Sequence, residues 1–155
     1  MNLAIGSDHA GFELKQRLAD DLRRAGHNIT DVGADSDAPS DYPDFAEKIA
    51  KVILSGQAER GVLICGSGVG ASVAANKIPG IRAGLCHDHY SAHQGVEHDN
   101  VNLLVLGSRI IGIETARDAI SAFLSATFST EERHRRRVGK IGDIEKRYCA
   151  GAPLT

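Results

Sequence analysis

The sequence has few cysteines, no long apolar run and little net charge, and each shortage excludes a class of protein. Its three cysteines, Cys65, Cys86 and Cys149, are an odd number without a C-x-x-C pair, so neither a zinc site nor a disulfide framework is expected. No apolar run approaches the roughly 18 residues of a membrane span. A formal net charge of −2 provides no general attraction to nucleic acid or to an anionic membrane.

The length of 155 residues suits a single domain. A chain of this size can bury about 70% of the surface that it exposes when unfolded. Strand-like sequence begins at Asn2 and leaves no room for a signal peptide, so a cytoplasmic location is expected. We expect one domain over residues 1–149 and a disordered tail over 150–155.

Short apolar runs typical of strands alternate with helical patterns along the chain. The strand-like runs cover residues 3–6, 28–32, 62–65, 81–86 and 101–106. Helical patterns lie between and after them, two of them over residues 71–77 and about 91–97. Another carries Leu14, Leu18 and Leu22 at a spacing of four. This alternation predicts the α/β class: a single-domain three-layer α/β/α sandwich around a five-stranded parallel sheet, Rossmann-like, with an extra C-terminal helix over 130–148.

Polar side chains follow four of the expected strands. In a parallel sheet the carboxyl ends of the strands share one edge, and ligands bind there. The sequence therefore predicts a functional rim that collects residues from distant parts of the chain: Asp8, His9, Cys65, Ser67, His87, Asp88 and Arg109.

The central stretch, residues 60–77, has the order strand, glycine loop and helix. Gly66, Gly68 and Gly70 let backbone N–H groups converge, and the following helix adds a partial positive charge. Such a place suits an anion, or a negative charge that develops during a reaction. Cys65 at its edge is either a packing residue or a thiolate that serves as nucleophile or base, and spacing does not decide between these roles.

The same loop also fits a weaker motif. Residues 66–71 satisfy G-x-G-x-x-A, and Asp88 lies about 20 residues further on, as in dinucleotide-binding folds. That motif normally follows the first strand, whereas this loop follows the third. A tight turn without a ligand is the structural alternative.

Basic and histidine-rich segments complete the candidates. His89 and His93 have metal-ligand spacing, but no carboxylate completes a compact triad, so no metal is expected. Arg133 and Arg137 share a helix face and could grip a phosphate together; a solvated helix face is the alternative. The basic run over residues 133–137 (RHRRR) lacks interleaved aromatic residues, so nucleic-acid binding is not expected.

Several motifs in register resemble the type B ribose-5-phosphate isomerase family, which includes the galactose-6-phosphate isomerase subunits. They are the stretches at 6–11 (GSDHAG), 41–44 (DYPD), 65–70 (CGSGVG) and 74–77 (AANK). The resemblance covers residues 1–141. It implies a five-stranded parallel sheet and an aldose–ketose isomerase for phosphorylated sugars that uses neither metal nor cofactor. It also implies a homodimer, or a tetramer, with active sites shared between subunits.

The resemblance also implies roles for individual residues. Cys65 matches the base that moves a proton between C1 and C2, and Ser67 the hydroxyl that shuttles a proton between O1 and O2. Asp8 and His98 match the residues that handle the ring oxygen. The remaining matches are the enediolate-binding and sugar-binding residues Gly66, Gly68, Val69, Gly70, Tyr42 and Asp99, and the phosphate-binding residues His9, Arg109, Arg133 and Arg137, of which Arg133 and Arg137 come from the partner subunit.

The sequence departs from the family around His98. Most members read Arg-x-His-Asn where this chain has Val96-Glu97-His98-Asp99, and position 67 is often threonine. The isomerase prediction stands, with ribose 5-phosphate to ribulose 5-phosphate as the leading reaction. A tetrose phosphate (erythrulose or erythrose 4-phosphate) and a hexose 6-phosphate (galactose or allose) stay open as substrates. A dinucleotide-binding module and a non-catalytic sugar-phosphate sensor are the alternatives from other classes.

Overall fold

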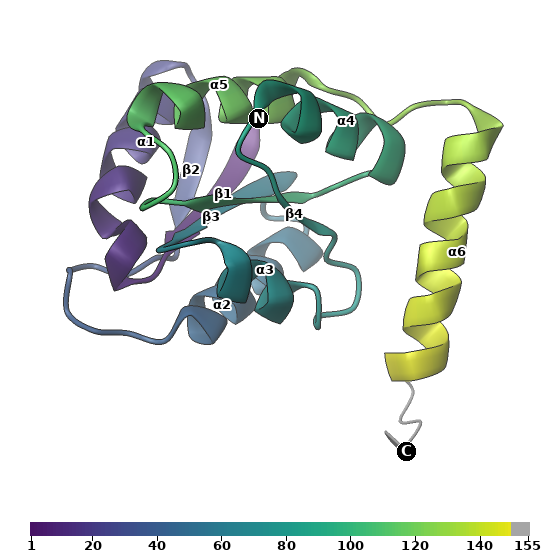
Figure 1. The fold of residues 1–155 in the computed structure, drawn as a ribbon, viewed down its shortest axis with the longest axis horizontal. Coiled ribbons are helices and arrows are strands. Elements are labelled where there is room, and N and C mark those ends of the chain that lie inside the picture. The colour runs from purple at the N-terminus through teal and green to yellow at the C-terminus, as the bar shows by residue number, and fades with distance from the viewer. Residues whose placement is uncertain (150–155) are drawn as a thin grey trace.

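The computed structural model describes residues 1–149, so the predicted tail at 150–155 lies outside the described residues. A single sheet of five parallel strands, in the order β2-β1-β3-β5-β4, runs through the molecule (Figure 1). The strands are β1 (Asn2–Ser7), β2 (Asn28–Asp31), β3 (Arg60–Cys65), β4 (Ala83–Leu85) and β5 (Leu103–Gly107). The predicted α/β sandwich is confirmed.

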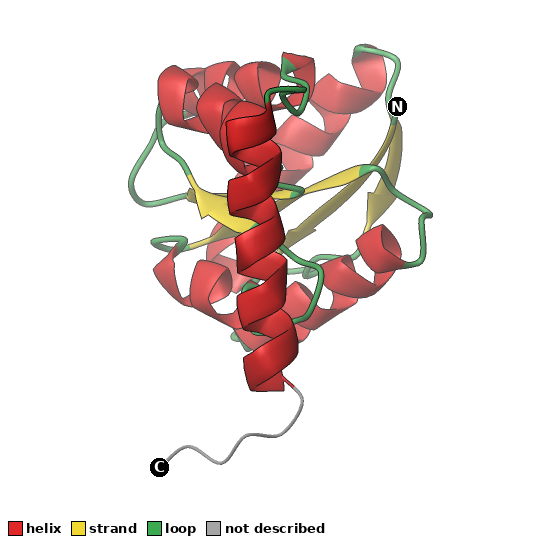
Figure 2. Ribbon diagram, turned by 90° about the vertical axis from the view of Figure 1, so that its right-hand side faces the viewer, coloured by secondary structure: helices red, strands yellow, loops and turns green. Residues whose placement is uncertain are grey.

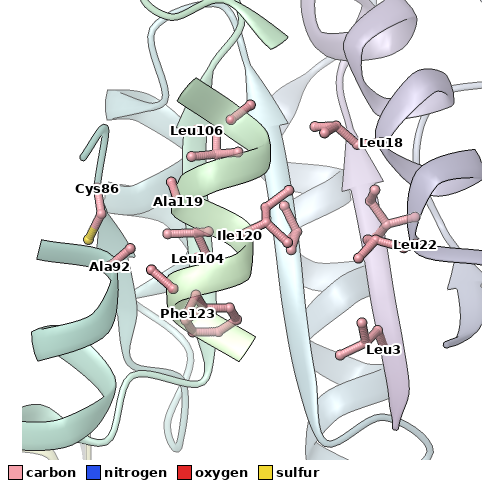
Figure 3. Close-up of a cluster of buried hydrophobic side chains, with 14 of the residues drawn as sticks. Leu3, Leu18, Leu22, Cys86, Ala92, Leu104, Leu106, Ala119, Ile120 and Phe123 are labelled. Atoms are coloured by element: carbon pink, nitrogen blue, oxygen red, sulfur yellow. The ribbon is translucent and has the colours of Figure 1, made fainter. Parts of the chain in front are cut away.

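Helices cover both faces of the sheet (Figure 1). One face carries α1 (Phe12–Arg24), α4 (His89–Asp99) and α5 (Ile113–Ser125), and the other carries α2 (Tyr42–Leu54) and α3 (Val69–Ala75). Each face therefore has its own buried cluster. Figure 3 shows the first, in which Phe123 of α5 packs among leucines of the strands and α1.

The apolar patterns of the sequence account for these elements. Residues 61–65 of β3 are all buried, as expected for a central strand covered on both faces. Leu18 and Leu22 of α1 are buried, and Leu14 packs against the same cluster. Gly26, with φ +88°, follows the helix in the left-handed conformation that commonly ends helices.

Several element boundaries differ from those predicted, three of them at β4, α3 and α4. β4 covers Ala83–Leu85 instead of 81–86, and α3 begins at Val69 instead of near residue 71. α4 covers His89–Asp99 instead of 91–97, because the Asp88 carboxylate accepts a hydrogen bond from the Ser91 amide (2.8 Å) and so caps the helix start. Asn100, with φ 52°, ends the same helix.

The last helix, α6 (Glu132–Cys149), crosses the edge of the sheet beside β4 (Figure 2). Its first part contacts α4, and lower down Glu145 Oε1 accepts a hydrogen bond from the Gly80 amide (3.0 Å). A groove of about 430 Å³ runs between α6 and the β4 edge. None of the helices within residues 1–149 combines the length and the apolar character needed to cross a membrane.

The turn after β1 packs tightly on the end of β3. It is a 3₁₀ turn, η1 (His9–Gly11), whose last residue also caps α1. A methyl group on Gly11 would lie 2.6 Å from the Ile64 carbonyl oxygen. Glycine is thus required here by a close approach of backbone to backbone.

Gly11→Ala is therefore expected to lower the free energy of unfolding. Gly112→Ala is the matched control, because Gly112 also caps a helix and no atom lies within 4 Å of its added Cβ. Both variants lose the same cap preference, so urea denaturation should show Gly11→Ala to be less stable by a further ~1–3 kcal/mol. Equal stability of the two variants would contradict the tight packing of η1 on β3.

Candidate functional site

The carboxyl ends of four strands meet at one edge of the sheet, and hydrogen bonds tie the segments that follow them. The Ser108 hydroxyl after β5 donates to the Ala10 carbonyl (2.7 Å), and the Ser108 amide donates to the Cys65 carbonyl (2.8 Å). The Gly107 amide donates to Nε2 of His87 (2.9 Å), which follows β4. The structure thus brings the segments that follow β1, β3, β4 and β5 together, as expected for a parallel sheet.

Cys65 ends the central strand with its sulfur turned toward the start of α3. The residue is only 5% exposed, and the Gly68 amide donates a hydrogen bond to Sγ (3.1 Å). Gly68 adopts φ +82°, which brings that N–H back toward the strand. The Gly68 amide and the start of α3 thus both direct partial positive charge toward this sulfur.

The glycine loop presents further amide donors beside this sulfur. The Val69 amide donates to the Ser67 hydroxyl oxygen (3.3 Å), which leaves the Ser67 proton free to be donated. Gly68 and Val69 are engaged in this way, whereas the amides of Gly66, Ser67, Gly70 and Ala71 have no acceptor among residues 1–149, and the last two are adjacent at the start of α3. Two adjacent unpaired donors at a helix start can hold an oxyanion.

Tyr42 and Arg109 flank the loop. A methyl group on Gly70 would lie 2.7 Å from Cζ of Tyr42, so the tyrosine ring covers the start of α3. A methyl group on Gly66 would lie 3.6 Å from Cζ of Arg109, which places the guanidinium over the other end of the loop. An aromatic ring and a cation thus border the amide donors.

Asp8 and His9 stand at the same rim after β1. The Asp8 carboxylate is 6% exposed and accepts a hydrogen bond from the Gly11 amide (3.1 Å). His9 is held by Ser40, whose amide donates to Nδ1 (3.1 Å) while its hydroxyl accepts from the His9 amide (3.0 Å). Ser40 is a positioning residue that sequence reasoning missed, because only the fold brings the 33–41 loop to β1.

The positions of Cys86 and Asp88, which follow β4, are explained by packing and by helix capping. Burial raises the pKa of the Cys86 thiol, and nearby Asp88 raises it further, which suits a packing residue. Hydrogen bonds from Ser91 lower the pKa of Asp88, the cap of α4. Asp88 follows β4, and β5 separates β4 from β3. The acid of the dinucleotide motif thus does not stand on a strand next to the glycine loop, which argues against that alternative.

Four other predicted site residues lie at the opposite side of the sheet from the rim, near the amino ends of the strands: His98, Asp99, Arg133 and Arg137. α4 starts at the rim and returns antiparallel to the strands, and its 11 residues span roughly 16 Å. His98 and Asp99 end this helix, beside the stretch that leads into α6 (Figure 1). Arg133 and Arg137 are on the first turns of α6, so one chain does not bring these four residues to Cys65.

This second cluster is basic and has a buried histidine at its centre. The His98 ring stacks on the ring of His134, with centroids 4.0 Å apart and planes 24° apart. Burial lowers the pKa of His134, and His98 and Arg133 lower it further. Arg133 pairs with Glu131 (Nε to Oε2, 2.7 Å). His134 stood in the predicted basic run without a role, because sequence alone does not mark which member of that run is buried.

The histidines with metal-ligand spacing bind other partners. Nδ1 of His89 lies 3.0 Å from Oδ1 of Asp118, and Nδ1 of His93 lies 3.7 Å from Oε2 of Glu97. Across residues 1–149, no three histidine, cysteine or acidic side chains gather as a metal site would require.

The sequence was compared with families and individual proteins of known function, and the matches span both the rim and the cluster at α4 and α6. A sequence model of the family described as Ribose/Galactose Isomerase matches residues 3–141. Ribose-5-phosphate isomerase B of Escherichia coli is 41% identical over 145 residues, which are 94% of this chain and 97% of that protein. D-erythrulose-4-phosphate isomerase of Pectobacterium atrosepticum is 41% identical over 129 residues, which are 83% of this chain and 85% of that protein.

A solved structure gives the same picture. Ribose-5-phosphate isomerase B of Clostridium thermocellum has a TM-score of 0.93 and 47% sequence identity. The match covers 96% of this chain and 99% of that chain. The similarity therefore includes the rim, the α4 cluster and most of α6.

The loop geometry predicts a cost for a side chain at Gly68. Gly68→Ala combines a positive φ with overlap against Leu85 Cδ1 and an approach of 3.3 Å to the Gly107 amide. Gly56→Ala is the matched control, because Gly56 has φ +76° and no atom within 4 Å of its added Cβ. Urea denaturation should show Gly68→Ala to be the less stable by ~1–3 kcal/mol; a smaller loss than in Gly56→Ala would contradict the close approach of the loop to β5.

Proposed function

The chain belongs to the ribose/galactose isomerase family and is a sugar-phosphate isomerase, and from this premise we propose that it interconverts ribose 5-phosphate and ribulose 5-phosphate through an enediolate. The observation that carries the proposal is the Cys65 sulfur beside the donors of the glycine loop. The ribose-5-phosphate isomerases B of E. coli and C. thermocellum, which share 41% and 47% of their residues with this chain, support the choice of a pentose phosphate.

The chemical step moves one proton between carbons and one between oxygens. Cys65, as the thiolate, takes the proton from C2 of the open-chain aldose and returns it to C1. Ser67 passes the O2 proton to O1, and the unpaired amides of Gly70 and Ala71 stabilise the negative oxygen of the intermediate. A carbon acid of this kind is too weak for a side-chain base unless that charge is stabilised.

Residues outside the glycine loop bind the rest of the sugar phosphate. Asp8 and His98 act on the ring oxygen and open the cyclic form, and Tyr42 and Asp99 contact the sugar. The phosphate is bound by His9 and by three arginines, Arg109, Arg133 and Arg137. Binding of the phosphate holds C1 and C2 next to the thiolate. The binding energy of the phosphate is thereby used to position the reacting carbons.

A second copy of the chain supplies the distant half of this site. His98, Asp99, Arg133 and Arg137 lie roughly a helix length from Cys65 in one chain, which supports a homodimer with shared sites. Exposed apolar side chains support the same arrangement: Val69 and Val73 on α3, Leu85 on β4, and Ile141 and Ile144 on α6. Large apolar side chains that remain exposed in groups commonly mark such contacts.

A tetrose phosphate is the second candidate substrate. Val96 is 1% exposed and packs in the core under α4, so it offers the sugar no polar group. Asp99, in contrast, is exposed next to His98 and carries a negative charge. The 41% identity to D-erythrulose-4-phosphate isomerase of P. atrosepticum supports including a four-carbon sugar phosphate among the substrates tested below.

The function is tested by incubating the protein in D₂O with four-, five- and six-carbon sugar phosphates and following deuterium at C1 and C2 by NMR. We expect fastest exchange and turnover with ribose 5-phosphate. Cys65→Ser should lower turnover about 10²–10⁴-fold because it lacks the base. Cys86→Ala is the control, because it removes a buried cysteine that also follows a strand. Binding without exchange would instead indicate a sensor, and preferred turnover of the tetrose phosphate would favour the second candidate.

Shared sites are tested by mixing two inactive variants. Cys65→Ala and Arg137→Ala should each be poorly active alone. In a heterodimer of the two, one site carries both changes and the other carries neither. After unfolding and refolding together in equal amounts, random pairing should restore about a quarter of the wild-type activity.

The control for this experiment is each variant refolded alone. Mixing without any gain over these controls would contradict a site that joins Cys65 of one chain to Arg137 of another.

A further inference from the structure

The contact between α4 and α6 holds a buried histidine that the proposed mechanism does not use. His134 is 2% exposed, and its Nδ1 has no hydrogen-bond partner among the described residues. Its Nε2 lies 3.9 Å from Oε2 of Glu131, beyond hydrogen-bond range. A buried polar ring without partners is rare and calls for a physical explanation.

The ring of His98 lies stacked against this buried histidine. Its Nε2 is 3.8 Å from Oε2 of Glu97, too far for a hydrogen bond, and about a third of its side chain is exposed. The ring of His134 stacks directly on the face of this imidazole, with 4.0 Å between centroids. A hydrogen bond from the Ser129 amide to the Glu97 carbonyl (2.9 Å) ties the loop before α6 to α4 at this point.

We propose that His134 is a positioning residue for ring opening, a fixed aromatic surface that holds the His98 imidazole in its working orientation. The inference rests on the proposed function, because it assigns His134 a part in the same site. Ring opening breaks the bond from C1 to the ring oxygen, removes the proton of the anomeric hydroxyl and puts a proton on the ring oxygen. No other reactant is consumed, and His98 carries one of the two protons.

The charges around His134 favour this arrangement. His98 faces it from α4, and the charged neighbours on α6 and the preceding loop are Arg133, Arg137 and Glu131. Burial and the cations keep the pKa of His134 low, while Glu131 opposes them. His134 is therefore uncharged near neutral pH, and it does not repel His98 when that ring takes up a proton.

The chemistry of the two sugars separates ring opening from proton transfer. Ribose 5-phosphate is mostly cyclic. Ribulose 5-phosphate is open-chain, because its phosphate blocks the oxygen that would close a five-membered ring. Deuterium exchange at C1 of ribulose 5-phosphate therefore needs the Cys65 step but not ring opening, whereas turnover of ribose 5-phosphate needs both.

The test measures both reactions in the full-length protein and in three variants. In His134→Ala, kcat for ribose 5-phosphate should fall about tenfold with little change in KM, while C1 exchange of ribulose 5-phosphate stays within about twofold. His134→Phe keeps an aromatic face and should recover most of the lost kcat. His27→Ala is the matched control; it removes a partly buried histidine that lies against α1 and α5, with an Nδ1 that also lacks a partner among residues 1–149.

Each outcome decides the inference. Equal losses in both reactions, an unchanged kcat in His134→Ala, or no recovery in His134→Phe would overturn it. If His134→Ala does not fold, His134→Phe decides alone: it must turn over ribose 5-phosphate at close to the wild-type rate. If the wild-type protein exchanges ribulose 5-phosphate and the His134 variants behave like it in both reactions, this inference is overturned but the proposed function is not. Wild-type protein that exchanges no sugar phosphate would overturn the proposed function, and the inference with it.

Discussion

In a parallel sheet, every strand ends at one edge, and every helix that follows must return to the other edge before the next strand can begin. In this protein that rule separates the candidate residues into two groups. Asp8, Cys65 and Arg109 follow strands and stand at the rim, whereas His98 ends a returning helix and stands at the far edge. A site that uses both groups must join two chains, so the direction of the strands favours a shared site before any contact between subunits is considered.

At the rim, the chemistry depends on how closely backbone segments approach. Gly11 lets the turn after β1 lie against the Ile64 carbonyl, and Gly68 turns an amide back toward the Cys65 sulfur. These two approaches bring the Asp8 carboxylate, the thiol and the amide donors of α3 together on a rigid edge. Fixed donors need no rearrangement when charge develops, and this is why amides suit the stabilisation of an enediolate.

At the far edge, the arrangement depends on burial and charge. His134 is enclosed where α4 meets α6, while Arg133 and Arg137 on the same helix stay exposed. The cluster therefore has an uncharged aromatic centre and a cationic surface. Cations displayed in this way can bind a phosphate, and the buried ring leaves His98 as the histidine of the stacked pair that faces solvent.

The sequence by itself determined the sheet, the order of its elements and the rim, because strand-forming apolar runs and the polar residues after them are local features. It also predicted the glycine loop at Cys65, and its motifs led to the isomerase family. Only the tertiary structure decided that Ser40 holds His9, that His134 lies beneath His98, and that His98 stands a helix length from Cys65. Such facts depend on which distant segments meet and on which side of a helix is covered, and no local pattern encodes them. The start of α4 differed from the prediction for a related reason: its side-chain cap, Asp88, acts through geometry that composition does not reveal.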